Sequence, residues 1–342
     1  MDKNRKLTLI MRSPVGYALL LSILALCTIL SIRVGSTAMS FREFFGALFL
    51  KEEYKTFSII IYSVRIPRCL GAILAGVGLS VSGAVLQSAL DNPLAAPSVI
   101  GVNSGAGAAA VITLAVFPRF LIGSVNYFLP IFAFIGAFLT TLVVIFLANK
   151  CGGTRSGIVL AGVAVSALFN AIISAATLLD TDVLASYNAF SVGGVSGVEA
   201  LRLITPSAII ALSLIGGILI SGGLDLMVLG EVGAATLGLR VKLHRTLALI
   251  IAAASAAAAV SFAGLLGFVG LVAPHIARRL VGLKSRPLIL TSAIIGAIIT
   301  TLADTLGRVL LSPSEIPLGI MMALIGVPFF ITLITKRRED EI

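Results

Sequence analysis

Nine long stretches without a charged residue divide this chain of 342 residues. A helix needs about 20 apolar residues to cross the hydrocarbon core of a membrane. Each stretch is long enough for one span, in some cases with a flanking residue or two. The pattern therefore predicts an all-α polytopic membrane protein. The stretches are 13–32, 69–90, 92–118, 120–149, 156–179, 203–224, 246–277, 287–303 and 316–335.

The stretch 246–277 is too long for a single helix, and its second half carries three glycines and Pro274. Glycine and proline weaken or end a helix. We therefore divide this stretch into one full helix, about 245–263, and a short glycine-broken helix that ends near Leu280. The division raises the number of expected spans from nine to ten.

Basic residues mark both ends of the chain, within residues 3–12 and at 336–338. Basic flanks of membrane spans stay in the cytoplasm, so both termini are expected there and the number of spans should be even. With ten spans, 16 of the 25 basic residues are cytoplasmic and nine lie on or near the outer face. We predict ten transmembrane helices with both termini in the cytoplasm.

The apolar segment near the N-terminus has an alternative interpretation as a cleaved signal sequence. Its core is long enough to span, and no Ala-x-Ala-like cleavage site follows it. The run 24–27 (LALC) resembles a lipoprotein processing site, but Leu26 stands where a small residue is expected. We favour an uncleaved first helix.

Composition narrows the classes of protein further. Apolar residues make up 58% of the chain and charged residues only 12%, with a mean hydropathy of +1.11. Soluble domains are about 25% charged, so a large soluble enzyme, a disordered chain and a nucleic-acid-binding module are all excluded. We attribute the net charge of +10 to basic residues that flank membrane spans rather than to a surface that binds nucleic acid.

The cysteines and histidines do not form a pattern typical of a metal site. Cys27, Cys69 and Cys151 have no Cys-x-x-Cys spacing, and buried thiols that pack as small hydrophobes explain them better. His244 and His275 have no acidic cluster beside them in the sequence. We expect this chain to bind no metal and no cofactor, and we expect His275 to lie in a structural turn with a basic anchor.

The chain has no obvious source of energy of its own. It contains no G-x-x-x-x-G-K-[ST] loop for ATP. Asp304 and Arg308 are four residues apart on one expected helix and should pair with each other, and Glu315 lies at an outer turn. An ion-coupled carrier usually needs buried carboxylates on several helices. The energy should therefore come from a partner protein.

The cytoplasmic loop 222–242 is suited to bind such a partner. Its apolar residues recur at 226, 229, 232 and 237, with small residues between them, which predicts two short helices joined near Gly238. Lying on the membrane, these helices would offer one face to another protein. The alternative is an interfacial helix that only anchors the bundle.

Several short runs occur in order between about residues 15 and 335. They are 64–68 (VRIPR), 82–87 (SGAVLQ), 91–97 (DNPLAAP), 160–163 (LAGV), 229–231 (LGE), 267–275 (GFVGLVAPH), 303–305 (ADT), 315–319 (EIPLG) and 326–330 (GVPFF). As a set they closely resemble the iron-chelate and vitamin B12 (FecCD-type) permease family of ABC importers.

The resemblance implies the type II ABC importer permease fold, with ten helices per subunit in a single membrane domain, residues 1–342, of which about 13–335 form the bundle. It also implies a second permease subunit, identical or related, two cytoplasmic ATPases that carry ATP and Mg, and an extracytoplasmic solute-binding protein. No nucleic acid is expected. The residues that match the ATPase-coupling helices are Leu229, Gly230, Glu231, Leu237, Gly238 and Arg240.

The same resemblance implies that Arg65, Arg68 and Arg308 meet glutamates of the binding protein at the outer face. Fixed cations at an aqueous rim can orient a partner and speed its arrival. The alternative is that Arg65 and Arg68 only snorkel at a helix start and that Arg308 only neutralises Asp304.

The resemblance places the cytoplasmic gate at Asn92, Leu94 and Ser156. Asn92 begins a natural turn before a proline, and Leu94 can close a narrow pore by dewetting. Arg155 departs from the family pattern, which has a small polar residue there. Gln87 either faces the path or hydrogen-bonds a neighbouring helix, and packing is favoured.

Together these observations predict a permease of the bacterial cell membrane that takes up a bulky metal chelate, a ferric siderophore being preferred to heme or cobalamin. ATP bound and hydrolysed by the partner would drive alternating access. Two hypotheses from other classes remain: an ion-coupled secondary carrier and a membrane-embedded enzyme acting on lipids. The latter would need a convergent catalytic set, and two histidines on cytoplasmic flanks do not supply one.

Overall fold

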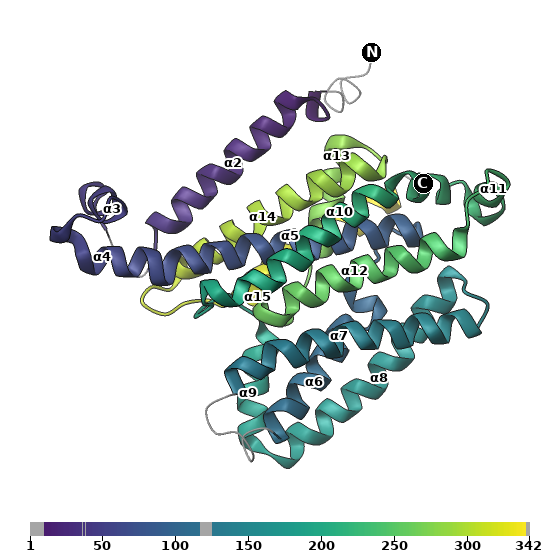
Figure 1. Ribbon diagram of the computed structural model, residues 1–342, viewed down its shortest axis with the longest axis horizontal. Coiled ribbons are helices and arrows are strands. Elements are labelled where there is room, and N and C mark those ends of the chain that lie inside the picture. The colour runs from purple at the N-terminus through teal and green to yellow at the C-terminus, as the bar shows by residue number, and fades with distance from the viewer. Residues whose placement is uncertain (1–9, 36, 38, 117–124, 340–342) are drawn as a thin grey trace.

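The computed structural model describes residues 10–339 except 36, 38 and 117–124. Over this part of the chain all regular structure is helical, and the helices form an elongated bundle (Figure 1). The basic residues expected at 3–6 lie outside the described residues. The helices are α2 (Pro14–Arg33), α3 (Phe41–Leu48), α4 (Lys55–Ile60), α5 (Ile66–Leu90), α6 (Val102–Val116), α7 (Val125–Lys150), α8 (Arg155–Leu179), α9 (Thr181–Val192), α10 (Ile204–Met227), α11 (Gly230–Thr236), α12 (Val241–Ala263), α13 (Val269–Val281), α14 (Ser285–Leu310) and α15 (Leu318–Glu339).

Seven helical segments of the described chain are long and apolar enough to cross a membrane. They are α2, the segment Glu52–Leu90, α7, α8, α10 with the turn before it, α12 and α14. The apolar helix α6 and the apolar part of α15, Leu318–Thr332, are shorter than a full span. These findings confirm an all-helical protein with several membrane-spanning helices.

The expected span 92–118 differs from the structure at its beginning. The segment from Asn92 to Gly101 forms turns and a short 3₁₀ helix, and α6 starts only at Val102. The side-chain oxygen of Asn92 accepts a hydrogen bond from the Leu94 backbone N–H at 2.9 Å, and Gly101 adopts a φ of +82°. Both features favour turns over helix, which hydropathy alone does not reveal.

The division of residues 246–277 into two helices is confirmed. α12 ends at Ala263, Gly264 has a φ of +70°, and α13 begins at Val269. Residues of the break bind backbone groups near the end of α9, a helix that the sequence analysis did not anticipate: the Leu265 N–H donates to the Phe190 carbonyl at 3.2 Å. His275 lies inside α13, so the prediction that it lies in a turn is wrong.

The core consists of α5, α12 and α14, which are the most buried of the spanning helices. Small residues let α5 approach the other two helices closely. A Cβ atom added to Gly76 of α5 would lie 2.3 Å from the Gly296 carbonyl oxygen of α14. Hydroxyl groups join the same helices, because Ser255 donates to the Gly78 carbonyl at 2.8 Å and Thr300 to the Ala72 carbonyl at 2.7 Å. This packing by small residues is typical of helix association in membranes, where lipid tails remove the hydrophobic drive.

The two ends of the bundle are different. One end, which we call the α11 end, carries α11; Arg12 lies there and its Nε donates to the Val281 carbonyl at 2.6 Å at the close of α13. α3 and α4 project from the opposite end, which we call the α3 end (Figure 1). One helical segment, with a π-helical turn at Ile61–Arg65 just before Pro67, runs from α4 through α5.

The close approach of α5 and α14 predicts a strong response to one added methyl group. Gly76→Ala should destabilise the protein by about 1–3 kcal/mol, because the new Cβ meets backbone atoms that cannot yield. Gly222→Ala in α10 is the matched control, since nothing lies within 4 Å of its Cβ position. Thermal unfolding of the purified protein in detergent measures both variants. Equal midpoints for the two would contradict this account of the core.

Candidate functional site

The segment between α10 and α12 is built as a projecting turn. α11 occupies Gly230–Thr236, and its first residue, Gly230, and Gly238 beyond its end have φ values of +85° and +84°. Only glycine adopts this conformation without strain. The expected second short helix is absent from the described segment, because α12 begins at Val241 and takes up those residues.

The projecting segment exposes apolar side chains. Leu229, Val232 and Leu237 are each more than 60% exposed, whereas Ala234 is buried against the bundle. Exposed apolar residues grouped on one segment mark a site of contact with another molecule. The geometry therefore presents Leu229 and Leu237 outward, as a coupling role requires.

The charged residues of the segment have different surroundings. The Glu231 carboxylate accepts a hydrogen bond from Arg245 at 2.7 Å, and Arg245 also donates to the Gly153 carbonyl at 2.7 Å. Arg240 is exposed, and its carbonyl accepts from the His244 N–H at 3.0 Å. Glu231 thus joins α11 to α12 and to the loop between α7 and α8. Sequence reasoning missed Arg245, because its partners lie 14 and 92 residues away.

The predicted gate residues lie at the same end of the bundle. Asn92 and Leu94 belong to the turn after α5, Ser156 is the second residue of α8, and all three are exposed. Leu94 borders a small cavity together with His275 of α13 and Phe329 of α15. The ring centroids of these two residues are 5.6 Å apart in an edge-to-face arrangement, so Leu94 faces an apolar patch formed by two further helices.

Polar contacts connect the gate segments with their neighbours. Arg155 donates to the Asp91 carboxylate and to the Met227 carbonyl, each at 2.9 Å. Gln87 is buried, and its amide binds the Gly270 carbonyl at 3.2 Å and Arg278 at 3.1 Å. The favoured interpretation of Gln87, as a residue bonded to a neighbouring helix, is therefore confirmed.

Arg65 lies at the α3 end, and its guanidinium group is buried. It donates to the Ile32 carbonyl at 3.0 Å and also to the carbonyls of Arg33 and Thr37. These carbonyls follow or close the C-terminus of α2, where a cation is favourable. Arg65 thereby fixes the end of α2 to the π-helical turn before α5.

Arg68 and Arg308 share the buried carboxylate of Asp304. Arg68 lies 3.0 Å and Arg308 3.2 Å from it, and Arg68 also binds Glu315 at 2.6 Å. Arg308 further donates to the Ser31 hydroxyl at 2.8 Å and to the Val34 carbonyl at 2.8 Å. The expected pairing of Asp304 with Arg308 is confirmed, and Arg68 is a second partner. The docking role of Arg65, Arg68 and Arg308 stays a prediction, and in this structure all three are bound within their own chain.

The shared carboxylate leads to a prediction about stability. Asp304→Asn leaves the buried guanidinium group of Arg308 without its counter-charge and leaves Arg68 only Glu315, so we expect a loss of about 3–5 kcal/mol. Glu199→Gln is the control, since Glu199 pairs with Arg202 at the surface and such pairs contribute about 0–1 kcal/mol. Thermal unfolding in detergent compares the two variants. A midpoint for Asp304→Asn equal to that of the control would show that the buried cluster is not needed for stability.

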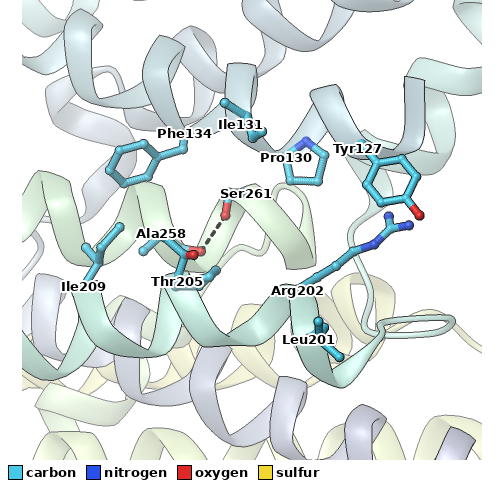
Figure 2. A pocket seen from close by; sticks show the side chains of 11 residues that line it. Tyr127, Pro130, Ile131, Phe134, Leu201, Arg202, Thr205, Ile209, Ala258 and Ser261 are labelled. Carbon is cyan, nitrogen blue, oxygen red and sulfur yellow. Dashed lines mark hydrogen bonds between the residues drawn. The ribbon is translucent and has the colours of Figure 1, made fainter. Parts of the chain in front are cut away.

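An apolar cavity of about 410 Å³ lies between α7, α10 and α12 (Figure 2). Pro130, Ile131 and Phe134 form one wall, and Arg202 lies over the Tyr127 ring at 4.4 Å. The predicted coupling, docking and gate residues do not line it. Its chemistry suits a hydrocarbon chain better than a polar chelate. Among the described residues, no group of three or more His, Cys, Asp and Glu gathers as a metal site would require.

These features define a class of protein. Apolar spanning helices, an exposed apolar segment at one end and charge clusters at both ends are typical of a membrane transport subunit. Because the sequence lacks a nucleotide-binding loop, a separate motor fits this class.

The chain belongs to the FecCD transport family, whose model matches residues 23–336. It is 38% identical to the Fe(3+)-citrate import system permease protein YfmE of Bacillus subtilis over 282 residues. This alignment covers 82% of this chain and 83% of the relative. The chain is 32% identical over 334 residues to the hemin transport system permease protein HmuU of Yersinia pestis, with 96% and 97% covered.

A solved structure supports the same assignment. It is described as an inward-facing conformation of a metal-chelate type ABC transporter, and it matches with a TM-score of 0.84 and 30% identity over 95% of this chain and 100% of that one. The protein is therefore a multi-pass permease subunit of an ABC importer.

Proposed function

We propose that this permease imports a ferric siderophore across the bacterial cell membrane, driven by ATP hydrolysis on separate ATPase subunits. The observation that carries the mechanism is the projecting α11 segment, with its two positive-φ glycines and exposed leucines. Members of the family are permease subunits, so the motor must bind from outside the bundle. We further propose that two copies, or two related chains, enclose the path.

The proposed topology has ten spans and both termini in the cytoplasm. Arg12 lies at the α11 end, and the second half of α15 approaches the same end, since Phe329 contacts His275. Lys150, Arg155, Arg240, Lys242 and Arg245 also lie around this end, which agrees with the positive-inside rule. α6, α13 and α15 are then the short spans, completed by the turns before and after them.

Coupling would proceed from α11 to the gate. A groove on the ATPase receives Leu229 and Leu237, and Gly230 and Gly238 allow the segment to fold against it. Arg240 is free at the surface to bind the same partner, while Glu231 transmits the movement through Arg245 to the loop at Gly153. Asn92, Leu94 and Ser156 then open or close the path.

At the opposite end, Arg65, Arg68 and Arg308 remain the proposed docking site for a solute-binding protein. Their support is their position at the end away from α11 and the residual exposure of the Glu315 carboxylate beside Arg68. A carboxylate of the partner would have to displace Glu315 from Arg68. Docking at this site would therefore rearrange the cluster around Asp304.

Relatives of this chain carry different cargoes. Besides the citrate and hemin permeases, a vitamin B12 import permease of Vibrio cholerae is 35% identical over 286 residues, with 82% of this chain and 84% of that protein covered. A siderophore permease of Bacillus subtilis and an iron(3+)-hydroxamate permease also match at 38% and 35% identity. Iron chelates are the more frequent cargo among these, which favours a ferric siderophore over heme or cobalamin.

The coupling proposal predicts the effect of two glycine substitutions. Gly230→Val and Gly238→Val should each cost about 1–2 kcal/mol of local backbone strain and should abolish the ATP hydrolysis that depends on the permease. No atom lies within 4 Å of either Cβ position, so the bundle should stay folded. ATPase activity and size-exclusion profile of the purified complex measure the two effects.

Gly197→Val is the control for this pair. Gly197 has the same type of backbone conformation, with a φ of +71°, and equally open surroundings, but it lies in the loop between α9 and α10. Normal ATP hydrolysis by both coupling variants, or an equal loss of ATP hydrolysis in the control, would reject α11 as the ATPase contact.

The cargo proposal predicts a defined uptake defect. Cells that lack this gene should lose uptake of a radiolabelled ferric siderophore, hydroxamate or catecholate, and regain it when the gene is restored. Heme and cobalamin uptake should be unchanged. Loss of cobalamin or heme uptake alone would keep the importer and replace its cargo, whereas uptake by this chain alone in liposomes without ATP would support an ion-coupled carrier instead.

A further inference from the structure

Arg155 is the residue at which the gate region departs from the small polar residue expected there. It is the first residue of α8, behind the N-cap Thr154, whose hydroxyl accepts the Gly157 N–H at 3.1 Å. A long cation at the start of a helix is unfavourable for the helix dipole. Its presence is therefore explained by what the guanidinium group contacts rather than by the helix.

The guanidinium group of Arg155 reaches two other segments at once. One terminal nitrogen donates to the Asp91 carboxylate and the other to the Met227 carbonyl, both at 2.9 Å. Asp91 ends α5 in the left-handed conformation, with a φ of +48°. Met227 is the buried last residue of α10. One side chain thus joins the ends of α5 and α10 to the start of α8.

These three segments are those that the proposed mechanism must move together. The turn after Asp91 carries Asn92 and Leu94, the start of α8 carries Ser156, and α10 leads through one turn into α11. We propose that Arg155 is a latch between the coupling segment and the gate: it holds both gate segments to the end of α10 and releases them when the ATPase displaces α11. This inference rests on the proposed function and adds a positioning residue to it.

The exposure of the contacts supports a bond that breaks and reforms. The side chains of Arg155 and Asp91 are 29% and 44% exposed, so water competes for both charges and the pair is weak. Arg245 at the same end is only 5% exposed, and its bond to Glu231 is shielded on that side. We therefore assign different roles to the two arginines. Arg245 connects α11 and α12 permanently, whereas the contacts of Arg155 are released.

The chain supplies its own reporter for this movement. Cys151 is exposed in the loop before α8, whereas Cys27 and Cys69 are buried. A nitroxide reagent should therefore label Cys151 in the native sequence, within the complex purified through a tag on this chain. Trapping with ATP and vanadate should change the nitroxide spectrum of the wild-type complex.

We expect Arg155→Ala to separate ATP hydrolysis from movement of the gate. Its ATP hydrolysis should stay within about twofold of wild type. The response of the nitroxide to ATP should be lost. The amount of radiolabelled ferric siderophore delivered per ATP should fall about fivefold or more. Arg155→Lys keeps the charge but reaches one partner, and Asp91→Asn removes the counter-charge while the bond to the Met227 carbonyl stays. Both should give partial loss, and Asp91→Asn combined with Arg155→Ala should be no worse than Arg155→Ala alone.

Arg202→Ala is the matched control. Arg202 is also 29% exposed and paired with a glutamate, but at the opposite end of the bundle, so its replacement should leave the nitroxide response unchanged. A wild-type response and wild-type delivery per ATP in Arg155→Ala would overturn the latch. If that variant does not fold, unchanged coupling in both Arg155→Lys and Asp91→Asn would overturn it equally. A wild-type complex that contains no ATPase and hydrolyses no ATP would instead reject the proposed function.

Discussion

The close approach of α5 to both α12 and α14 determines the rest of this structure. α5 contacts both of these helices through glycine, alanine and serine, and at Gly76 there is no space even for a methyl group. Within lipid such contacts replace the hydrophobic drive that holds soluble proteins together. Because the centre is so densely packed, the peripheral helices α2, α8 and α10 keep most of their surface free for lipid or for other subunits.

Charge is confined to the two ends of this packed centre, and its surroundings differ between them. At the α3 end, Asp304 and its two arginines are buried. At the α11 end, Arg155 and Asp91 are open to water. Burial makes an ion pair costly to break, whereas exposure makes it cheap. The ion pairs around Asp304 are therefore harder to break than the pair of Arg155 with Asp91.

The sequence predicted the helical class, most span limits and the break at Gly264, because these depend on local hydropathy and on glycine. It also located α11 and its glycines. It did not predict α9, the turns at 92–101 or the partners of the arginines. Arg68 meets Asp304 across 236 residues, and Arg65 binds backbone carbonyls, which carry no signal in the sequence. The coupling, docking and gate roles are inferred from family resemblance. The structure gives the hydrogen bonds and ion pairs that these residues make.

The helical segment that runs from α4 through α5 has a mechanical consequence. Arg68 lies near one end of α5 and Asp91 closes the other, and 23 residues of helix separate them by about 35 Å, more than the thickness of a hydrocarbon layer. When a helix of this length tilts as a rigid body, its ends on the two sides of the membrane change position relative to each other. Binding at the Arg68 end would then be coupled to the Asp91 end by the tilt of this one helix, without a series of side-chain movements between them.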